Sequence, residues 1–243
     1  MATATHIHRY VLTDEDRAIF AKLPSNSKQQ YADKVTEWRV GLTEAGQQVN
    51  AGCTDSVVEY YSTYQFPYSA YYMNGRVIAQ IVAESVSDKQ AKIIDIAAGT
   101  GLAGIELRKR GFVNIDALEP AHGMIANIPK NTYGKVYEEA IYKYKPTSIS
   151  NDSYDCATIA AAVGPGHIEE IHIPEIARMV RPGGTIIFDI QEDEVEPQNF
   201  GSKLDAKLHS LRETGVFTSI MKHKNMYIYD VEDNIVYTLK VAK

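Results

Sequence analysis

The sequence predicts a doubly wound α/β fold, and three observations support this prediction. From residue 55 onward, short apolar runs alternate with segments of helical periodicity. The glycine-rich turn Gly99-Thr100-Gly101 comes two residues after the apolar run 92–96, a pattern typical of a strand that is followed by a helix. The last two strand-like runs, 216–230 and 234–241, are joined by a short turn and must therefore pair antiparallel. We expect a seven-stranded sheet whose last strand is antiparallel.

The individual elements follow from local signals. The run Lys92-Ile93-Ile94-Asp95-Ile96 is typical of a parallel strand that is buried on both faces. Gly111 suits the end of one helix, and Pro174 suits the first turn of another. Strands are expected at 92–96, 113–118, 135–138, 154–162, 185–190, 216–230 and 234–241, and helices at 56–64, 74–86, 102–110, 124–128, 174–180 and 202–213.

Residues 1–54 have a different pattern. A hydroxyl-acid pair at Thr13 and Asp16 begins a helix that should run to about residue 23 and break at Pro24. A second helix is expected over 27–45, with one apolar stripe along it. We therefore expect an N-terminal helical extension, residues 1–54, that caps a Rossmann-like domain, residues 55–243.

Composition excludes several classes of protein. The 243 residues contain 25 Lys and Arg against 31 Asp and Glu, a net charge of −6, which disfavours a nucleic-acid-binding surface. No apolar run reaches the ~18 residues that a membrane span needs, and the N-terminus has no apolar signal region. The two cysteines, Cys53 and Cys156, and the seven histidines show no metal-ligand spacing. These features predict a cytoplasmic protein with no metal site.

The glycine turn has an acidic partner. Gly99 and Gly101 remove Cβ atoms where a ligand must approach the backbone, and free amides at the start of the following helix attract an anion. Glu119 ends the next strand, 20 residues after Gly99, where a carboxylate can accept both hydroxyls of a ribose. This arrangement predicts an adenosine-type cofactor, which NAD-dependent and S-adenosylmethionine-dependent enzymes both use.

Further motifs favour one of these classes. The segment Ile94–Gly101, the strand entry Tyr154-Asp155-Cys156-Ala157 and the turn Val180–Thr185 together resemble the class I S-adenosylmethionine-dependent methyltransferases, as does the closing antiparallel pair. Ile173-Pro174-Glu175 and Arg181-Pro182-Gly183-Gly184 more narrowly resemble the methyltransferase-like proteins of the Williams–Beuren deletion region. One departure is Ala97, where many family members have glycine.

The resemblance implies S-adenosylmethionine as cofactor and S-adenosylhomocysteine as product. It implies that the turn passes close to the methionine tail and ribose, that Asp95 acts near the tail's ammonium and that Glu119 holds the ribose. The expected cofactor-binding residues are Tyr61, Tyr68, Asp95, Ala97, Gly99, Gly101, Glu119, Pro120, Met124, Ala140, Ile141 and Ala160. Of these, Pro120 and Met124 would flank the adenine. Ala140 and Ile141 would contact its edge, and Ala160 would lie against the methionine portion.

Catalytic candidates come from two segments. In the family, a tyrosine-rich stretch before the first strand of the sheet folds over the cofactor, and Tyr61 and Tyr68 match its tyrosines, although Ser62 and Ser69 replace its acids. Tyr64 lies between them and is a candidate for the reacting site. His167, just beyond the expected strand 154–162, is a candidate base because histidine titrates near neutral pH. An exposed loop histidine is the simpler interpretation.

The sequence thus predicts methyl transfer from S-adenosylmethionine to a small-molecule acceptor, with a protein acceptor as the alternative. No nucleic-acid or membrane partner is expected, and Ala160-Ala161-Ala162-Val163 stands where amino-directed nucleic-acid methyltransferases carry an Asn/Asp-Pro-Pro-aromatic signature. From other classes, an NAD(P)-linked oxidoreductase and a non-catalytic S-adenosylmethionine-binding protein stay open.

Overall fold

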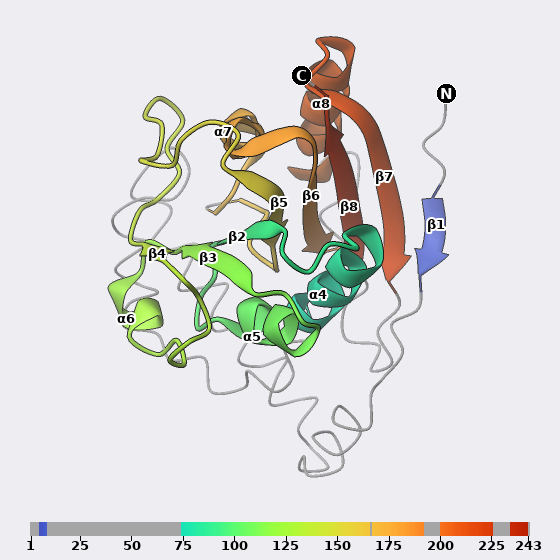
Figure 1. The fold of residues 1–243 in the computed structure, drawn as a ribbon. Coiled ribbons are helices and arrows are strands. Elements are labelled where there is room, and N and C mark those ends of the chain that lie inside the picture. Colours follow the sequence, from blue (N-terminus) through green and yellow to red (C-terminus); the bar gives the residue numbers. More distant parts are fainter. Residues whose placement is uncertain (1–4, 9–73, 166, 192–199, 226–233, 243) are drawn as a thin grey trace, which may run out of the picture.

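One mixed β-sheet organises the chain, with helices on both of its faces (Figure 1). The computed structural model describes residues 5–8, 74–165, 167–191, 200–225 and 234–242. The helices expected at 13–23, 27–45 and 56–64 lie outside these residues. The strands are β1 (Thr5–His8), β2 (Lys92–Ile96), β3 (Asn114–Leu118), β4 (Val136–Tyr137), β5 (Tyr154–Ile159), β6 (Val180–Gln191), β7 (Phe217–Asn225) and β8 (Asn234–Val241). The helices are α4 (Asn74–Ser85), α5 (Leu102–Lys109), α6 (His122–Ile125), α7 (Ile173–Met179) and α8 (Phe200–Glu213), with a 3₁₀ turn at Glu170–His172.

The strand order is β1-β7-β8-β6-β5-β2-β3-β4. Strands β2 to β6 run parallel, and β8 lies antiparallel between β6 and β7. This confirms the predicted α/β fold with its seven strands and antiparallel last strand. The structure adds one strand that the sequence did not predict, because β1 pairs parallel with β7 at the edge of the sheet.

Each face of the sheet has its own hydrophobic core. Ile93, Ile115 and Cys156 pack under α4 and α5, whereas the neighbouring Ile94 and Ala157 pack under α7 and α8. Successive residues of a strand point to opposite faces, so strands covered on both sides are apolar throughout. The continuous apolar runs of the sequence therefore reflect burial on both faces.

Several boundaries differ from the predicted ones. The strand expected at 154–162 ends at Ile159, because Ala161 has a left-handed backbone with φ of 52°. The helix expected at 124–128 occupies His122–Ile125. Strand β6 begins at Val180 rather than at residue 185 and passes through Gly183 and Gly184. A Cβ on Gly184 would lie 2.8 Å from the Asp155 carbonyl oxygen, so only glycine lets the two strands approach there.

Among the helices that the structure describes, none has the length and apolar character needed to cross a membrane.

Candidate functional site

The turn between β2 and α5 presents an open face at Gly99. Gly99 has φ of 56° and Gly101, the residue that precedes α5, has φ of 88°, a region that glycine adopts without strain. Among the residues that the structure describes, none has an atom within 4 Å of a Cβ built on Gly99. The Gly101 amide is bonded to the Ala98 carbonyl at 2.9 Å, which closes the turn. The backbone at Gly99 is therefore approachable by a ligand.

Glu119 lies directly beside this turn. Its Oε2 accepts a hydrogen bond from the Gly99 amide at 2.8 Å, and its Oε1 accepts one from the Ala121 amide at 2.9 Å. The side chain is 5% exposed, and burial raises its pKa although both amides favour the charged form. The structure thus brings together the two residues on which the sequence prediction rested. A carboxylate accepts about four hydrogen bonds, and the described residues use two of these acceptor positions on Glu119.

Asp95 lies beneath the turn. Its Oδ2 accepts the Tyr133 hydroxyl at 2.6 Å, its Oδ1 accepts the Thr158 hydroxyl at 3.2 Å, and the carboxyl is 1% exposed. Burial raises the pKa of Asp95 to about 6, against the hydrogen bonds from Tyr133, Thr158 and the Gly104 backbone. The sequence placed Asp95 near the tail of a cofactor. In the structure its carboxyl accepts hydrogen bonds from two side chains of the protein, and its place near the tail of a cofactor stays a prediction.

Tyr133 accounts for two glycines near this turn, Gly101 and Gly104. A Cβ on Gly104 would lie 2.4 Å from the Tyr133 ring, and one on Gly101 would lie 3.3 Å from the same ring and from Ile128. The ring therefore fills the space that both glycines leave. Sequence reasoning missed Tyr133, because an isolated aromatic residue in a loop carries no periodic signal. The position that a Cβ of Gly101 would occupy faces this ring. Only the backbone of Gly101 is left to face a ligand.

Ala97 also adopts a left-handed conformation, with φ of 53°, and its amide bonds the Leu118 carbonyl at 2.8 Å. This conformation costs an alanine about 1–2 kcal/mol relative to the right-handed one. The family's preference for glycine at this position thus has a direct physical reason. Ala97 and Ala161 end neighbouring strands, β2 and β5, with the same unfavourable backbone. Such strain concentrates at functional sites.

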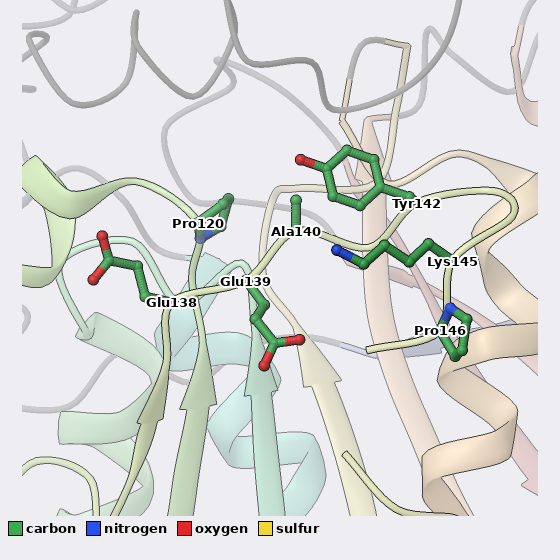
Figure 2. Close-up of a pocket in the computed structure, with 7 residues that line it drawn as sticks. All are labelled: Pro120, Glu138, Glu139, Ala140, Tyr142, Lys145 and Pro146. Carbon is green, nitrogen blue, oxygen red and sulfur yellow. The ribbon is translucent and has the colours of Figure 1, made fainter. Parts of the chain in front are cut away.

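A pocket of about 480 Å³ opens beyond the carboxyl ends of β3 and β4 (Figure 2). It is lined by Pro120, Glu138, Glu139, Ala140, Tyr142, Lys145 and Pro146. In Figure 2, the Tyr142 ring and the Lys145 side chain point toward Ala140, and Pro120 lies on the other side of Ala140. Two residues that the sequence placed at the adenine, Pro120 and Ala140, thus lie in one pocket. Sequence reasoning missed Glu138, whose Oε1 lies 3.3 Å from Nδ1 of His122.

Two other residues expected at the adenine, Ile141 and Met124, are not among those that line this pocket. Ile141 is 2% exposed and belongs to the hydrophobic core between the sheet and the α7–α8 face, so its side chain is not part of the pocket lining. The expected contact of Ile141 with the adenine edge therefore stays a prediction. Met124 lies half-buried on α6 and is not among the residues that line the pocket.

The pocket wall is held by two carboxylates. Glu139 accepts the Ser148 amide at 2.9 Å as well as its hydroxyl, and Glu175 of α7 accepts the Thr147 amide at 2.8 Å. Arg178 donates to Glu175 at 2.6 Å. Burial by itself would raise the pKa of Glu175, but this bond and those from Thr147 lower it. Glu175 is the acid of the Ile173-Pro174-Glu175 motif. Its structural role is to fix the chain at Thr147, directly after Pro146 of the pocket lining.

The loop after β5 contains the remaining described candidates. Ala160 and Ala161 are half-buried, and the Ala161 amide donates to Asp189 of β6 at 2.7 Å. His167 lies in the same loop, with Nδ1 3.3 Å from the Pro165 carbonyl oxygen, and desolvation lowers its pKa. A neutral imidazole is the form that accepts a proton. Tyr61, Tyr64 and Tyr68 lie outside the described residues.

Comparison with known proteins gives an independent view of the fold. The Burkholderia thailandensis 1,6-didemethyltoxoflavin-N1-methyltransferase, solved with 1,6-didemethyltoxoflavin and S-adenosylhomocysteine, aligns with a TM-score of 0.56 and 14% identity, covering 80% of this chain and 94% of that one. A Leishmania major S-adenosylmethionine-dependent methyltransferase aligns with a TM-score of 0.55 and 15% identity, covering 75% of this chain and 81% of that one. The chain has the class I methyltransferase fold. A Thermotoga maritima S-adenosylmethionine-dependent methyltransferase, described as a possible histamine N-methyltransferase, aligns at a TM-score of 0.52 with 15% identity over 76% of this chain and 99% of that one.

At the level of sequence, no protein-family model matches the chain. The human methyltransferase-like protein 27 is 24% identical over 131 residues, which are 54% of this chain and 53% of that protein. The chain thus spans about half the length of the curated relative that it matches. The sequence predicted a resemblance to methyltransferase-like proteins, and this relative is one of them.

Proposed function

We propose that this chain transfers a methyl group from S-adenosylmethionine to an acceptor. The observation that carries the proposal is the joint placement of Glu119 and Gly99. A buried carboxylate, which accepts two hydrogen bonds, lies beside a backbone where a Cβ on Gly99 would meet no atom of the described residues within 4 Å. S-adenosylmethionine, when bound, supplies a methyl group that its sulfonium charge has already activated.

The residues of the chain bind and orient this cofactor. Glu119 accepts the ribose hydroxyls, and the amides that begin α5 face the tail carboxylate. Ala160, beyond β5, lies against the methionine portion. Pro120 and Ala140 provide the apolar surface of the adenine pocket, with Met124 nearby on α6, and Glu138 accepts from the exocyclic amine of the adenine. Holding donor and acceptor in line accounts for most of such catalysis, worth about 7–11 kcal/mol when alignment is good.

The acceptor is proposed to be a small molecule, with a protein as the alternative. The net charge of −6 supports an acceptor other than a nucleic acid. His167, whose pKa is lowered by desolvation, is the proposed base if the acceptor must lose a proton. Tyr61, Tyr64 and Tyr68 remain predicted contributors to the reacting site. The two cysteines of the chain support a reducing compartment such as the cytoplasm.

Residues 55–243 are proposed to form the methyltransferase domain, with residues 1–54 as an extension. The pairing of β1 with β7 joins residues 5–8 of that extension to the sheet, so the two parts share hydrogen bonds. We expect removal of residues 1–54 to destabilise the domain for this reason.

Calorimetric titration with S-adenosylmethionine, S-adenosylhomocysteine and NAD, run in parallel, tests the proposal. Micromolar binding of the two sulfur compounds without NAD binding supports it. Binding of NAD alone favours an oxidoreductase and overturns it. Binding of S-adenosylmethionine without methyl transfer to any acceptor in a broad screen favours the non-catalytic alternative.

A further inference from the structure

Asp189 is a buried carboxylate that the proposed function does not use. It is the tenth residue of β6 and is 1% exposed. Burial raises its pKa, although hydrogen bonds from Ala161, Asn74 and Asn234 favour the charged form. Burying an ionised group is expensive unless several donors compensate for the lost water. A carboxylate in this position therefore points to a specific task.

Three elements of the fold meet at this carboxylate. Oδ1 accepts the backbone amide of Ala161, in the loop after β5, at 2.7 Å. Oδ2 accepts the side-chain amide of Asn234, the first residue of β8, at 2.6 Å, and also that of Asn74, the first residue of α4. One side chain thus joins the carboxyl ends of β5 and β6 to the starts of β8 and α4.

The bond to Ala161 acts on a strained backbone. Ile159, the last residue of β5, pairs with Phe188 of β6. Asp189 is the next residue of β6, so it lies where the chain of β5 leaves the sheet. Ala161 then adopts φ of 52°, which an alanine avoids without support. The hydrogen bond to Asp189 supplies that support, and the direction of the chain at Ala160 depends on it.

We infer that Asp189 is the positioning residue for the amino-acid end of the cofactor. This inference rests on the proposed function, in which Ala160 faces the methionine portion. Asp189 touches no ligand in this account. It acts by fixing the Ala160–Ala162 loop, whereas Glu119 and the pocket around Pro120 hold the adenosine end independently.

Two ligands separate these ends of the site. S-adenosylhomocysteine contains the amino-acid part, and 5′-methylthioadenosine lacks it but keeps the adenine, ribose and sulfur. Asp189→Asn leaves one acceptor oxygen for donors from three residues. We expect it to weaken S-adenosylhomocysteine about tenfold or more, as for loss of a hydrogen bond to a charged group, and 5′-methylthioadenosine by less than about twofold. Asn74→Ala, which leaves the Ala161 bond in place, should show a smaller loss with the same preference.

The matched control is Asp205→Asn. Asp205 of α8 is also a carboxylate that accepts hydrogen bonds from two other elements. Its donors are Tyr237 of β8 at 3.0 Å and Lys222 of β7 at 2.5 Å, on the α8 face of the sheet. It should change neither affinity. The inference is overturned if Asp189→Asn lowers the affinities for both ligands in parallel, or lowers neither. If Asp189→Asn does not fold, the same two results with Asn74→Ala overturn the inference. If the unmodified protein binds neither ligand, the proposed function itself fails, which is a distinct result.

Discussion

The Glu119 carboxylate accepts a hydrogen bond from the Gly99 amide at 2.8 Å, so the residue that follows β3 holds the turn that follows β2. A second bond, from the Ala121 amide, ties the same carboxylate to the start of α6. Hydrogen bonds within the protein therefore hold the turn and the carboxylate together. A site organised in this way loses little conformational freedom on binding, which favours affinity.

Removing the Tyr133 hydroxyl should destabilise the fold. Tyr133→Phe keeps the ring that packs against Gly101 and Gly104 but removes the donor that lies 2.6 Å from Asp95. A hydrogen bond to a charged group is worth about 1.5–3 kcal/mol, and we expect a loss of that size in the free energy of unfolding at pH 7. Urea denaturation measures it. Tyr144→Phe is the control, because Tyr144 is 87% exposed and should change nothing.

Asp95 should make stability depend on pH. Its pKa is raised from 3.8 to about 6 in the folded protein, so the folded state binds the proton more tightly than the unfolded state. The stabilising contribution is full below pH 4 and is lost as the pH rises through 6, about 3 kcal/mol in all. The Asn side chain does not titrate. Asp95→Asn should therefore gain stability relative to the unmodified protein between pH 4 and pH 7. A constant difference across that range would contradict the account.

The strained backbone at Ala97 offers a stabilising change. Ala97→Gly relieves the left-handed conformation, with φ of 53°, and this outweighs the greater freedom of glycine in the unfolded chain. We expect a gain of up to about 1 kcal/mol in the free energy of unfolding. The neighbouring Ala98 has no such backbone, so Ala98→Gly should lose about 0.5–1 kcal/mol instead. Equal effects of the two changes would show that Ala97 is not strained.

The motif acid Glu175 should affect the pocket as well as stability. Glu175→Ala leaves the Thr147 amide and the Arg178 guanidinium without their acceptor and frees the chain after the pocket loop. We expect a loss of about 1–3 kcal/mol in stability and weaker binding of 5′-methylthioadenosine, which occupies the adenosine end. Differential scanning calorimetry and titration measure the two effects. Glu213→Ala, which removes an exposed pair with His209, should produce neither.

The central strands could be predicted because burial on both faces leaves a continuous apolar run. β2 has the predicted bounds, since Lys92 and the glycine turn delimit it on both sides. The predicted end of β5 was wrong for a related reason. Ala160, Ala161 and Ala162 continue the apolar run, and no alanine signals that the backbone will turn left-handed.

What the sequence did not predict depends on contacts between distant segments. Tyr133 reaches Asp95 across 38 positions, and Asp189 reaches Asn74 across 115. Strand β1 is four residues long and pairs with β7, more than 200 residues later. Such isolated residues have no periodicity, and their roles appear only when the chain is folded. Glu119 was predictable because its distance from the glycine turn is set by one strand–helix–strand unit.

The most direct test of the account is the affinity of Glu119→Gln for S-adenosylhomocysteine, measured by calorimetry beside the unmodified protein. Gln keeps the size of the side chain and one acceptor oxygen, but it replaces the other oxygen with a donor that opposes the Gly99 or Ala121 amide. We predict unchanged secondary structure and an affinity lower by about tenfold or more, the effect of losing a hydrogen bond to a charged group. Undiminished affinity would contradict the assignment of Glu119 and Gly99 as the centre of the cofactor site.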